Sequence, residues 1–200
     1  NEAVYSAATT VIVGLLILTF SACLAFGTST ATLVSQSLGE GDPEKAERFG
    51  WSSVRLGLVL FGTIGFLEGV VFPREILSFL SSSPAVIEAG MIPLRMMGLC
   101  TPFVAVGMIL TQALFGAGRA YLLDQRPALA KPRFRLLVED GGTEPQLKSE
   151  ATWLLAWGHF DAGELEEARA YFQAVVDAKG RHADEAKGVL AALDGYDKLE

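Results

Sequence analysis

The chain has 200 residues, of which half are hydrophobic, and a formal net charge of −7. Two cysteines are too few for a disulfide framework and lack metal-ligand spacing, and the absence of a basic stripe disfavours nucleic acid as a partner. Residues 1–119 carry eight acids and six bases, whereas residues 120–200 carry fifteen acids and ten bases, so an apolar first part precedes a charged second part.

The first predicted element is a membrane-spanning helix at about residues 9–33. It lies in a run from Ala3 to Gly39 without a charged residue, and about 20 apolar helical residues cross a bilayer core about 30 Å thick. Charge returns abruptly after Gly39, where Gly39 and Gly41 favour a turn. Asp42 is expected to cap a second helix that has Pro43 at its first position.

Two further spans are predicted at residues 51–72 and 96–115. Arg55 and Glu68 lie near opposite ends of the former, and the latter has no charge. Three core helices of a soluble all-α domain are the alternative. Soluble helices show a polar stripe every three to four residues, which these runs lack, so we expect an all-α integral membrane protein with three transmembrane helices.

The basic residues predict the sidedness of the chain. The first connection holds Lys45 and Arg48, and five bases lie within 20 residues after the third span, whereas only Arg74 and Arg95 lie between spans two and three. The positive-inside rule therefore places the first connection and the C-terminal tail in the cytoplasm.

The apolar part resembles a transporter of the multidrug and toxic compound extrusion (MATE) family over about residues 3–120. The resemblance is carried by "GTSTATLVSQSLGEGDPEKAER", "LSSSPAVIEAGMIPLRMMG" and "TPFVAVGMILTQALFGAGRA". Gln36, Gly39 and Gly41 match the family's Gln-x-x-Gly-x-Gly-like element, and Gln112 precedes the later Gly-x-Gly at Gly116. The resemblance implies part of one six-helix lobe, in a bacterial inner membrane, from an antiporter that exports drugs or organic cations as H⁺ or Na⁺ enters.

The resemblance also suggests site residues. The family couples ion and drug through a membrane-embedded carboxylate, and the only candidate here is Glu68, for which a solvated interfacial acid is the alternative. Gln36, Gln112 and Thr101 are candidates for the substrate path; Gln112 could instead form a helix–helix hydrogen bond. Three helices cannot enclose a site made between two lobes, so the chain is not expected to transport alone.

The charged tail is predicted to begin with a linker at residues 120–147 that holds a short extended piece at 133–138. Residues 148–200 form the second predicted domain, because "ATWLLAWGHFDAGELEEARAYFQAVVDAKG" resembles a tetratricopeptide (TPR) repeat. Its packing positions are Leu155, Ala156, Gly163, Leu165, Ala168 and Phe172. A further helix is expected at 182–193. Such repeats imply a peptide or protein partner, and an ordinary helical hairpin is the alternative.

The sequence shows no set of a nucleophile, a base and a residue that orients the base, which argues against an enzyme. His159 and His182 lack carboxylate or cysteine neighbours at ligand spacing, which disfavours a metal; no cofactor is expected beyond the coupling ion. Two hypotheses remain. In the first, residues 1–119 are a partial transporter that needs the remainder of the protein or a second lobe. Its unrelated tail is then either a natural fusion or the product of a chimeric or truncated gene. Alternatively, three spans anchor a TPR-like interaction module to the lipid bilayer.

Overall fold

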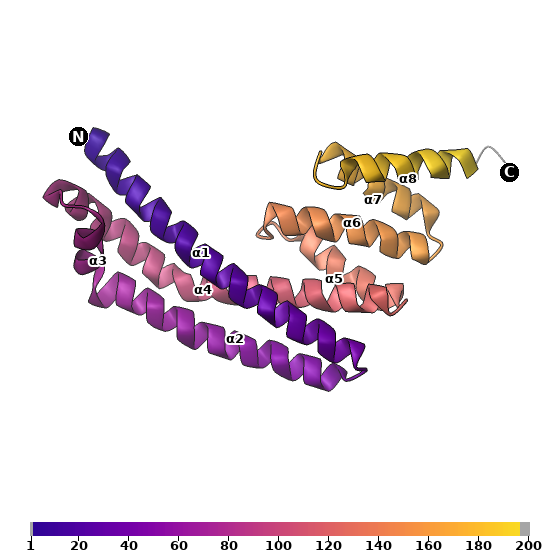
Figure 1. Cartoon of the computed structure of the whole chain (residues 1–200), viewed down its shortest axis with the longest axis horizontal. Helices are drawn as coiled ribbons and strands as arrows, with labels where there is room; N and C mark the ends of the chain where they lie inside the picture. Colours follow the sequence, from indigo (N-terminus) through magenta and orange to yellow (C-terminus); the bar gives the residue numbers. More distant parts are fainter. Residues whose placement is uncertain (1, 197–200) are drawn as a thin grey trace. The chain divides into compact units, whose positions relative to one another are not determined.

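A computed structural model describes residues 2–196, and this part of the chain is entirely helical outside its turns. The elements are drawn in chain order in Figure 1. They are α1 (Glu2–Gly39), α2 (Pro43–Phe66), the π-helix η1 (Leu67–Val71), α3 (Pro73–Leu80), α4 (Pro84–Leu123), α5 (Pro127–Glu139), α6 (Pro145–Asp161), α7 (Leu165–Asp177) and α8 (Ala183–Tyr196). The all-α prediction is confirmed.

Within residues 2–196, three helical segments are long and apolar enough to cross a membrane: Glu2–Gly39, Pro43–Val71 and Pro84–Leu123. Each contains one of the predicted spans. Their outward surfaces are hydrophobic, with Leu18, Val59 and Phe103 among many large exposed side chains. Soluble proteins of this size rarely expose so much apolar surface, whereas the hydrocarbon core of a membrane covers it.

The helical contacts divide the described chain into two units. The membrane unit contains residues 2–30 and 48–110, and the tail unit contains residues 31–47 and 111–196. In the membrane unit, α1, α2 and α4 meet around Cys23, Phe61 and Ala105. Phe26 of α1 adds an edge-on contact with Phe61 of α2, with ring centroids 5.9 Å apart.

The turn between α1 and α2 forms as predicted. Gly41 adopts a left-handed backbone with φ of 78°, which glycine accepts without steric cost. The Lys45 backbone N–H donates to Asp42 Oδ1 at 2.8 Å, so Asp42 caps α2, and Pro43 is the first residue of that helix. Charge appears here because the polar backbone ends of two helices need partners.

The predicted linker at 120–147 contains helix α5. Residues 133–138, predicted to be extended, lie within α5, so that prediction is wrong. Three prolines and the turn signal Asp140-Gly141-Gly142 suggested a linker. Pro127 and Pro145 instead begin α5 and α6, where no backbone donor is needed, and Pro132 lies inside α5. Ala130, Phe134 and Leu137 face inward, and the burial of this face outweighs the cost of the internal proline.

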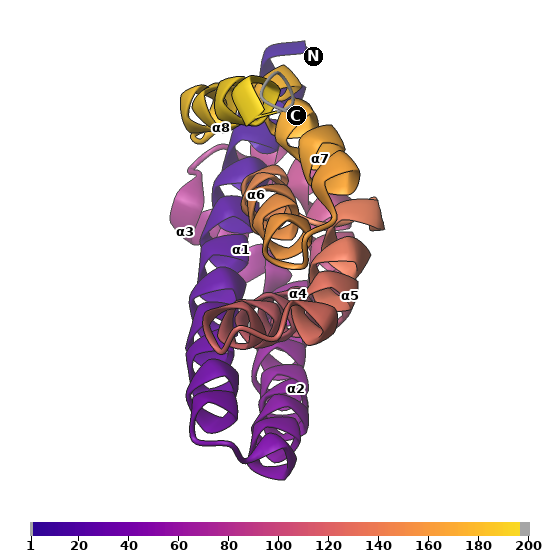
Figure 2. The ribbon, with the colours of Figure 1, turned by 90° about the vertical axis from the view of Figure 1, so that its right-hand side faces the viewer.

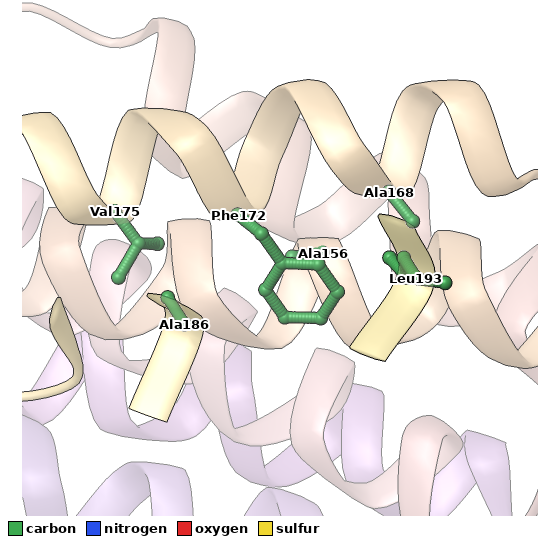
Figure 3. Close-up of a cluster of buried hydrophobic side chains, with 6 residues drawn as sticks. All are labelled: Ala156, Ala168, Phe172, Val175, Ala186 and Leu193. Carbon is green, nitrogen blue, oxygen red and sulfur yellow. The ribbon is translucent and has the colours of Figure 1, made fainter. Parts of the chain in front are cut away.

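The tail helices pack in chain order: α5 against α6, α6 against α7, and α7 against α8 (Figure 2). Figure 3 shows the core shared by α6, α7 and α8, in which the Phe172 ring lies beside Ala156. Of the six positions at which the TPR resemblance places packing residues, Leu155, Ala156, Ala168 and Phe172 are fully buried. Gly163 makes the turn with φ of 76°, but Leu165 is exposed.

Candidate functional site

Glu68 lies where the second membrane-crossing segment changes from α-helix to π-helix. The Phe72 N–H donates to Leu67 O at 2.8 Å, five residues back. Such π-helical turns are rare and occur frequently at functional sites. The side chain is half-buried, and its Oε2 atom is buried without a hydrogen-bond partner in the described chain. An unsatisfied carboxylate oxygen in an apolar segment can accept a proton or bind a cation.

A seam without large side chains runs along the contact between α2–η1 and α4. A Cβ added to Gly98 of α4 would lie 2.8 Å from the Cα of Gly69, and one added to Gly69 would lie 3.1 Å from Arg95 O. Only glycine lets the two backbones approach so closely. The seam therefore holds the π-helix, and with it Glu68, against α4.

Thr101 lies on the same seam, one turn beyond Gly98. A Cβ at Gly65 would meet the Thr101 Cβ at 3.0 Å. The Thr101 side chain is almost completely buried, and its hydroxyl donates to Met97 O at 2.9 Å within its own helix. In this arrangement Thr101 packs helices together.

The two glutamines predicted on the substrate path, Gln36 and Gln112, lie in the tail unit. Gln112 is buried on α4, one turn before Gly116, at which an added Cβ would lie 2.8 Å from the Cα of Ala31 in α1. Gln36 is exposed in the last turn of α1. The structure thus places Thr101 on the helix seam and Glu68 in the π-helix that packs there, sets Gln112 beside a second close helix contact, and leaves Gln36 on the surface.

Similarity to known proteins shows the family to which the chain belongs. The MatE family matches residues 3–122, which is more than half of the chain. The chain belongs to the MatE family. Over 99 residues it is 35% identical to the "Probable multidrug resistance protein NorM" of Thermotoga maritima, an alignment that covers 47% of this chain and 20% of that protein. The chain therefore spans about one fifth of the length of this curated relative, and no solved structure matches it.

The match confirms the resemblance to this transporter family and the prediction that the chain is not an enzyme. It ends at residue 122, one residue before the end of α4. The MatE segment thus contains the three predicted spans, the π-helix and all four predicted site residues. Helices α5 to α8 lie beyond it.

Outside the MatE segment, a network of three charged or polar side chains ties α5, α6 and α7 together. Lys131 Nζ lies 2.6 Å from Glu164 Oε1, and His159 Nδ1 lies 2.6 Å from Glu164 Oε2. A carboxylate only accepts, so Nδ1 carries the hydrogen. The hydrogen bonds from Lys131 and His159 hold the pKa of the Glu164 carboxyl below its ordinary value. The absence of a side chain at Gly158 makes room for the stem of Lys131, whose Cγ would lie 3.2 Å from an added Cβ.

His182 forms a second polar contact, between α6 and the start of α8. Its ring stacks on Trp153 with centroids 4.8 Å apart, its Nε2 lies 3.0 Å from Glu150, and its Nδ1 lies 2.9 Å from Glu185. Burial lowers the pKa of His182, but the hydrogen bonds with Glu185 and Glu150 outweigh burial, and the net effect raises it.

Both histidines therefore have carboxylate partners, which corrects the sequence prediction. Glu164 and Glu185 lie only five and three residues along the chain from their histidines, whereas Glu150 reaches His182 from 32 residues away. Residues 2–196 contain no group of three or more His, Cys, Asp or Glu side chains able to hold a metal ion. The π-helix had no sequence signal that we could identify, but Gly65, Gly69 and Gly98 could have revealed the seam.

Proposed function

We propose that residues 3–122 are part of a MATE-type antiporter that exports drugs or organic cations in exchange for H⁺ or Na⁺. The family match over three candidate spans carries the proposal, and the relative's printed name points to multidrug resistance. Because the chain spans about one fifth of that relative, and a midplane site lies between repeats, the remainder of a transporter has to complete the pathway.

Within this function, Glu68 is the proposed ion-coupling residue. Its buried, unpartnered Oε2 atom supports the assignment, since an intramembrane carboxylate is costly unless it serves a function. Gln36, Gln112 and Thr101 remain proposed substrate-path residues. Of these, the burial of Thr101 and its hydrogen bond to Met97 favour a role in helix packing.

The decisive experiment replaces the matching segment of the Thermotoga maritima protein with residues 3–122 of this chain. The chimera in proteoliposomes is expected to extrude ethidium when a proton or sodium gradient is applied, and Glu68→Gln is expected to abolish this gradient-driven extrusion. Glu75→Gln is the matched control, because Glu75 is an exposed acid on α3. The complete 200-residue chain alone is expected to show no extrusion. Extrusion by that chain, or equal extrusion by both glutamine variants, contradicts the proposal.

A second candidate function is favoured by the folded tail. Helices α5 to α8 bury two apolar clusters, one of which also takes side chains from the end of α4, so the chain could serve as a membrane-anchored, TPR-like interaction module with the tail in the cytoplasm of a bacterial cell. A peptide library panned against the reconstituted chain tests this candidate. Enrichment of one consensus peptide that requires the tail supports it, and a library without enrichment contradicts it.

A further inference from the structure

Helix α5 exposes an apolar face although it belongs to an acidic tail. The residues opposite its buried side are all exposed, and we call them the α5 outer face: Ala128, Leu129, Pro132, Arg135, Leu136 and Glu139. Leu129 is 42% exposed and Leu136 is 57% exposed. Leu123, at the end of α4, is 80% exposed. Leu129 and Leu136 lie two turns apart on the same face of α5, and an exposed apolar face of this kind marks a surface that binds something apolar.

The charge around the α5 outer face differs in sign from the rest of the tail. Residues 119–139 contain five bases and two acids, whereas residues 140–200 contain six bases and thirteen acids. Four of the five bases are arginines at positions 119, 126, 133 and 135. A positively charged, leucine-bearing helix thus precedes a strongly negative domain.

Three of these arginines, Arg119, Arg126 and Arg135, are exposed and able to meet an anion. Arg126 pairs with Asp124 at 3.2 Å, but both side chains are 61% exposed. Arg133 is half-buried and engaged within the protein, because it lies over the Tyr121 ring, 4.5 Å from its centroid, and donates to Leu129 O. Lys131, by contrast, is turned inward to Glu164 and is not part of the surface.

The position of α5 along the chain indicates what it meets. If residues 96–115 cross the hydrocarbon, the eight remaining residues of α4 rise about 12 Å, which brings the chain to the headgroup region beside the bilayer core. Only residues 124–126 then separate α4 from α5.

We propose that the α5 outer face lies on the membrane that the chain's own helices cross. Leu129 and Leu136 enter the boundary between headgroups and acyl chains, and Arg126 and Arg135 bind the phosphates of anionic lipids. An acidic protein partner would satisfy the arginines but not the leucines. The acidic helices beyond α5 are repelled by the same surface, which orients the tail. This inference rests on the membrane insertion and cytoplasmic tail of the proposed function.

The test uses the full chain reconstituted in vesicles of phosphatidylcholine, with or without phosphatidylglycerol. An environment-sensitive fluorophore is attached at Leu136→Cys in a Cys23→Ala, Cys100→Ala background, and its quenching by brominated lipid is measured. Gln173→Cys, exposed on α7, is the control position. Native Cys100, exposed in the third span, is labelled in the Cys23→Ala variant and reports insertion itself.

We expect the probe at position 136 to be quenched in vesicles that contain phosphatidylglycerol, and the probe at 173 to stay unquenched. Arg126→Gln with Arg135→Gln should reduce the docked-to-free ratio of α5 by about fivefold per arginine, and added salt should reduce it further. Arg181→Gln with Lys187→Gln, two exposed bases that also have acidic neighbours, should leave quenching unchanged.

Three results overturn the proposal: equal quenching at positions 136 and 173, quenching at 136 that does not depend on phosphatidylglycerol, or equal effects of the two glutamine pairs. Quenching at Cys100 without quenching at 136 shows that the spans insert while α5 stays in water. That outcome rejects this inference and leaves the proposed transport function standing.

Discussion

At the scale of single residues, His182 is the most informative side chain of the tail because its charge can be set by pH. It lies between Glu150 and Glu185 and stacks on Trp153. The imidazolium binds both carboxylates, whereas the neutral ring can donate to only one of them. The raised pKa of His182 therefore links protonation to the attachment of α8.

We expect the stability of the tail to fall as pH rises through the His182 pKa. A group whose pKa is higher in the folded state contributes its full stabilisation below its unfolded pKa, about 6.5 for histidine, and loses it above the folded one. Thermal unfolding followed by tryptophan fluorescence should show this loss between mildly acidic and alkaline pH. His182→Gln should be less stable in acid and should lose the dependence. A variant that retains the full pH dependence would exclude His182 as its source.

Glu164 acts at the opposite end of the pH scale. Its pKa is lowered by Lys131 and His159, so the carboxylate stabilises the tail above its unfolded pKa, and this stabilisation is lost as pH falls through the folded value. Lys131→Gln should weaken that acid dependence. The alkaline loss assigned to His182 should remain, which separates the two contacts.

At the scale of elements, the glycine seam decides how α2 and η1 meet α4. A side chain at Gly98 would collide with the backbone of Gly65 and Gly69, and one at Gly69 would press against Arg95 O. A backbone cannot move aside as a side chain can. The seam is thus the tightest constraint on where Glu68 lies.

Gly98→Val is expected to destabilise the membrane unit by about 3 kcal/mol or more, at or above the usual cost of overpacking, because both helices have to separate. Gly14→Val is the matched control, since an added Cβ there meets nothing within 4 Å. Thermal denaturation in detergent measures the difference. Equal melting temperatures for the two variants would show that the seam is not tightly packed.

The elements that sequence predicted well are those with a strong local signal. The three spans follow from hydropathy, and the start of α2 follows from Asp42 and Pro43, whose capping geometry the structure shows. Helix α5 was missed because its prolines outweighed a short apolar pattern. The identity of its neighbours, Leu155 on α6 and Phe115 on α4, is not encoded locally.

At the scale of the whole molecule, one helix belongs to both parts of the chain. The last turns of α4, at Leu114, Phe115 and Leu122, pack into the cluster around Phe134 of α5. A domain boundary near residue 119 would cut through this cluster, so the boundary predicted from composition remains a proposal. Among the site residues, the burial of Gln112 and Thr101 could not be predicted from sequence spacing, because it depends on contacts between helices.

Gly118→Leu tests this shared cluster. An added Cβ at Gly118 lies 2.8 Å from the Phe134 ring, so the larger side chain should lower the melting temperature of the tail while the spans still insert. Ala117→Leu, one position away on a half-buried side of the helix, is the comparison and should cost less. Protease protection of the tail in vesicles distinguishes the two, and equal protection contradicts the shared cluster.

The length of α1 limits how it can occupy a bilayer. Its 38 residues measure about 57 Å, against a hydrocarbon thickness of about 30 Å, and even a tilt of about 40°, the upper end of what is observed, does not absorb the difference. Several turns must therefore stand outside the acyl chains. Tyr5, Thr9 and Thr10 at the N-terminal end suit the watery boundary, where both threonine hydroxyls already bond to their own backbone, so a thicker membrane would draw in turns that a thinner one leaves out.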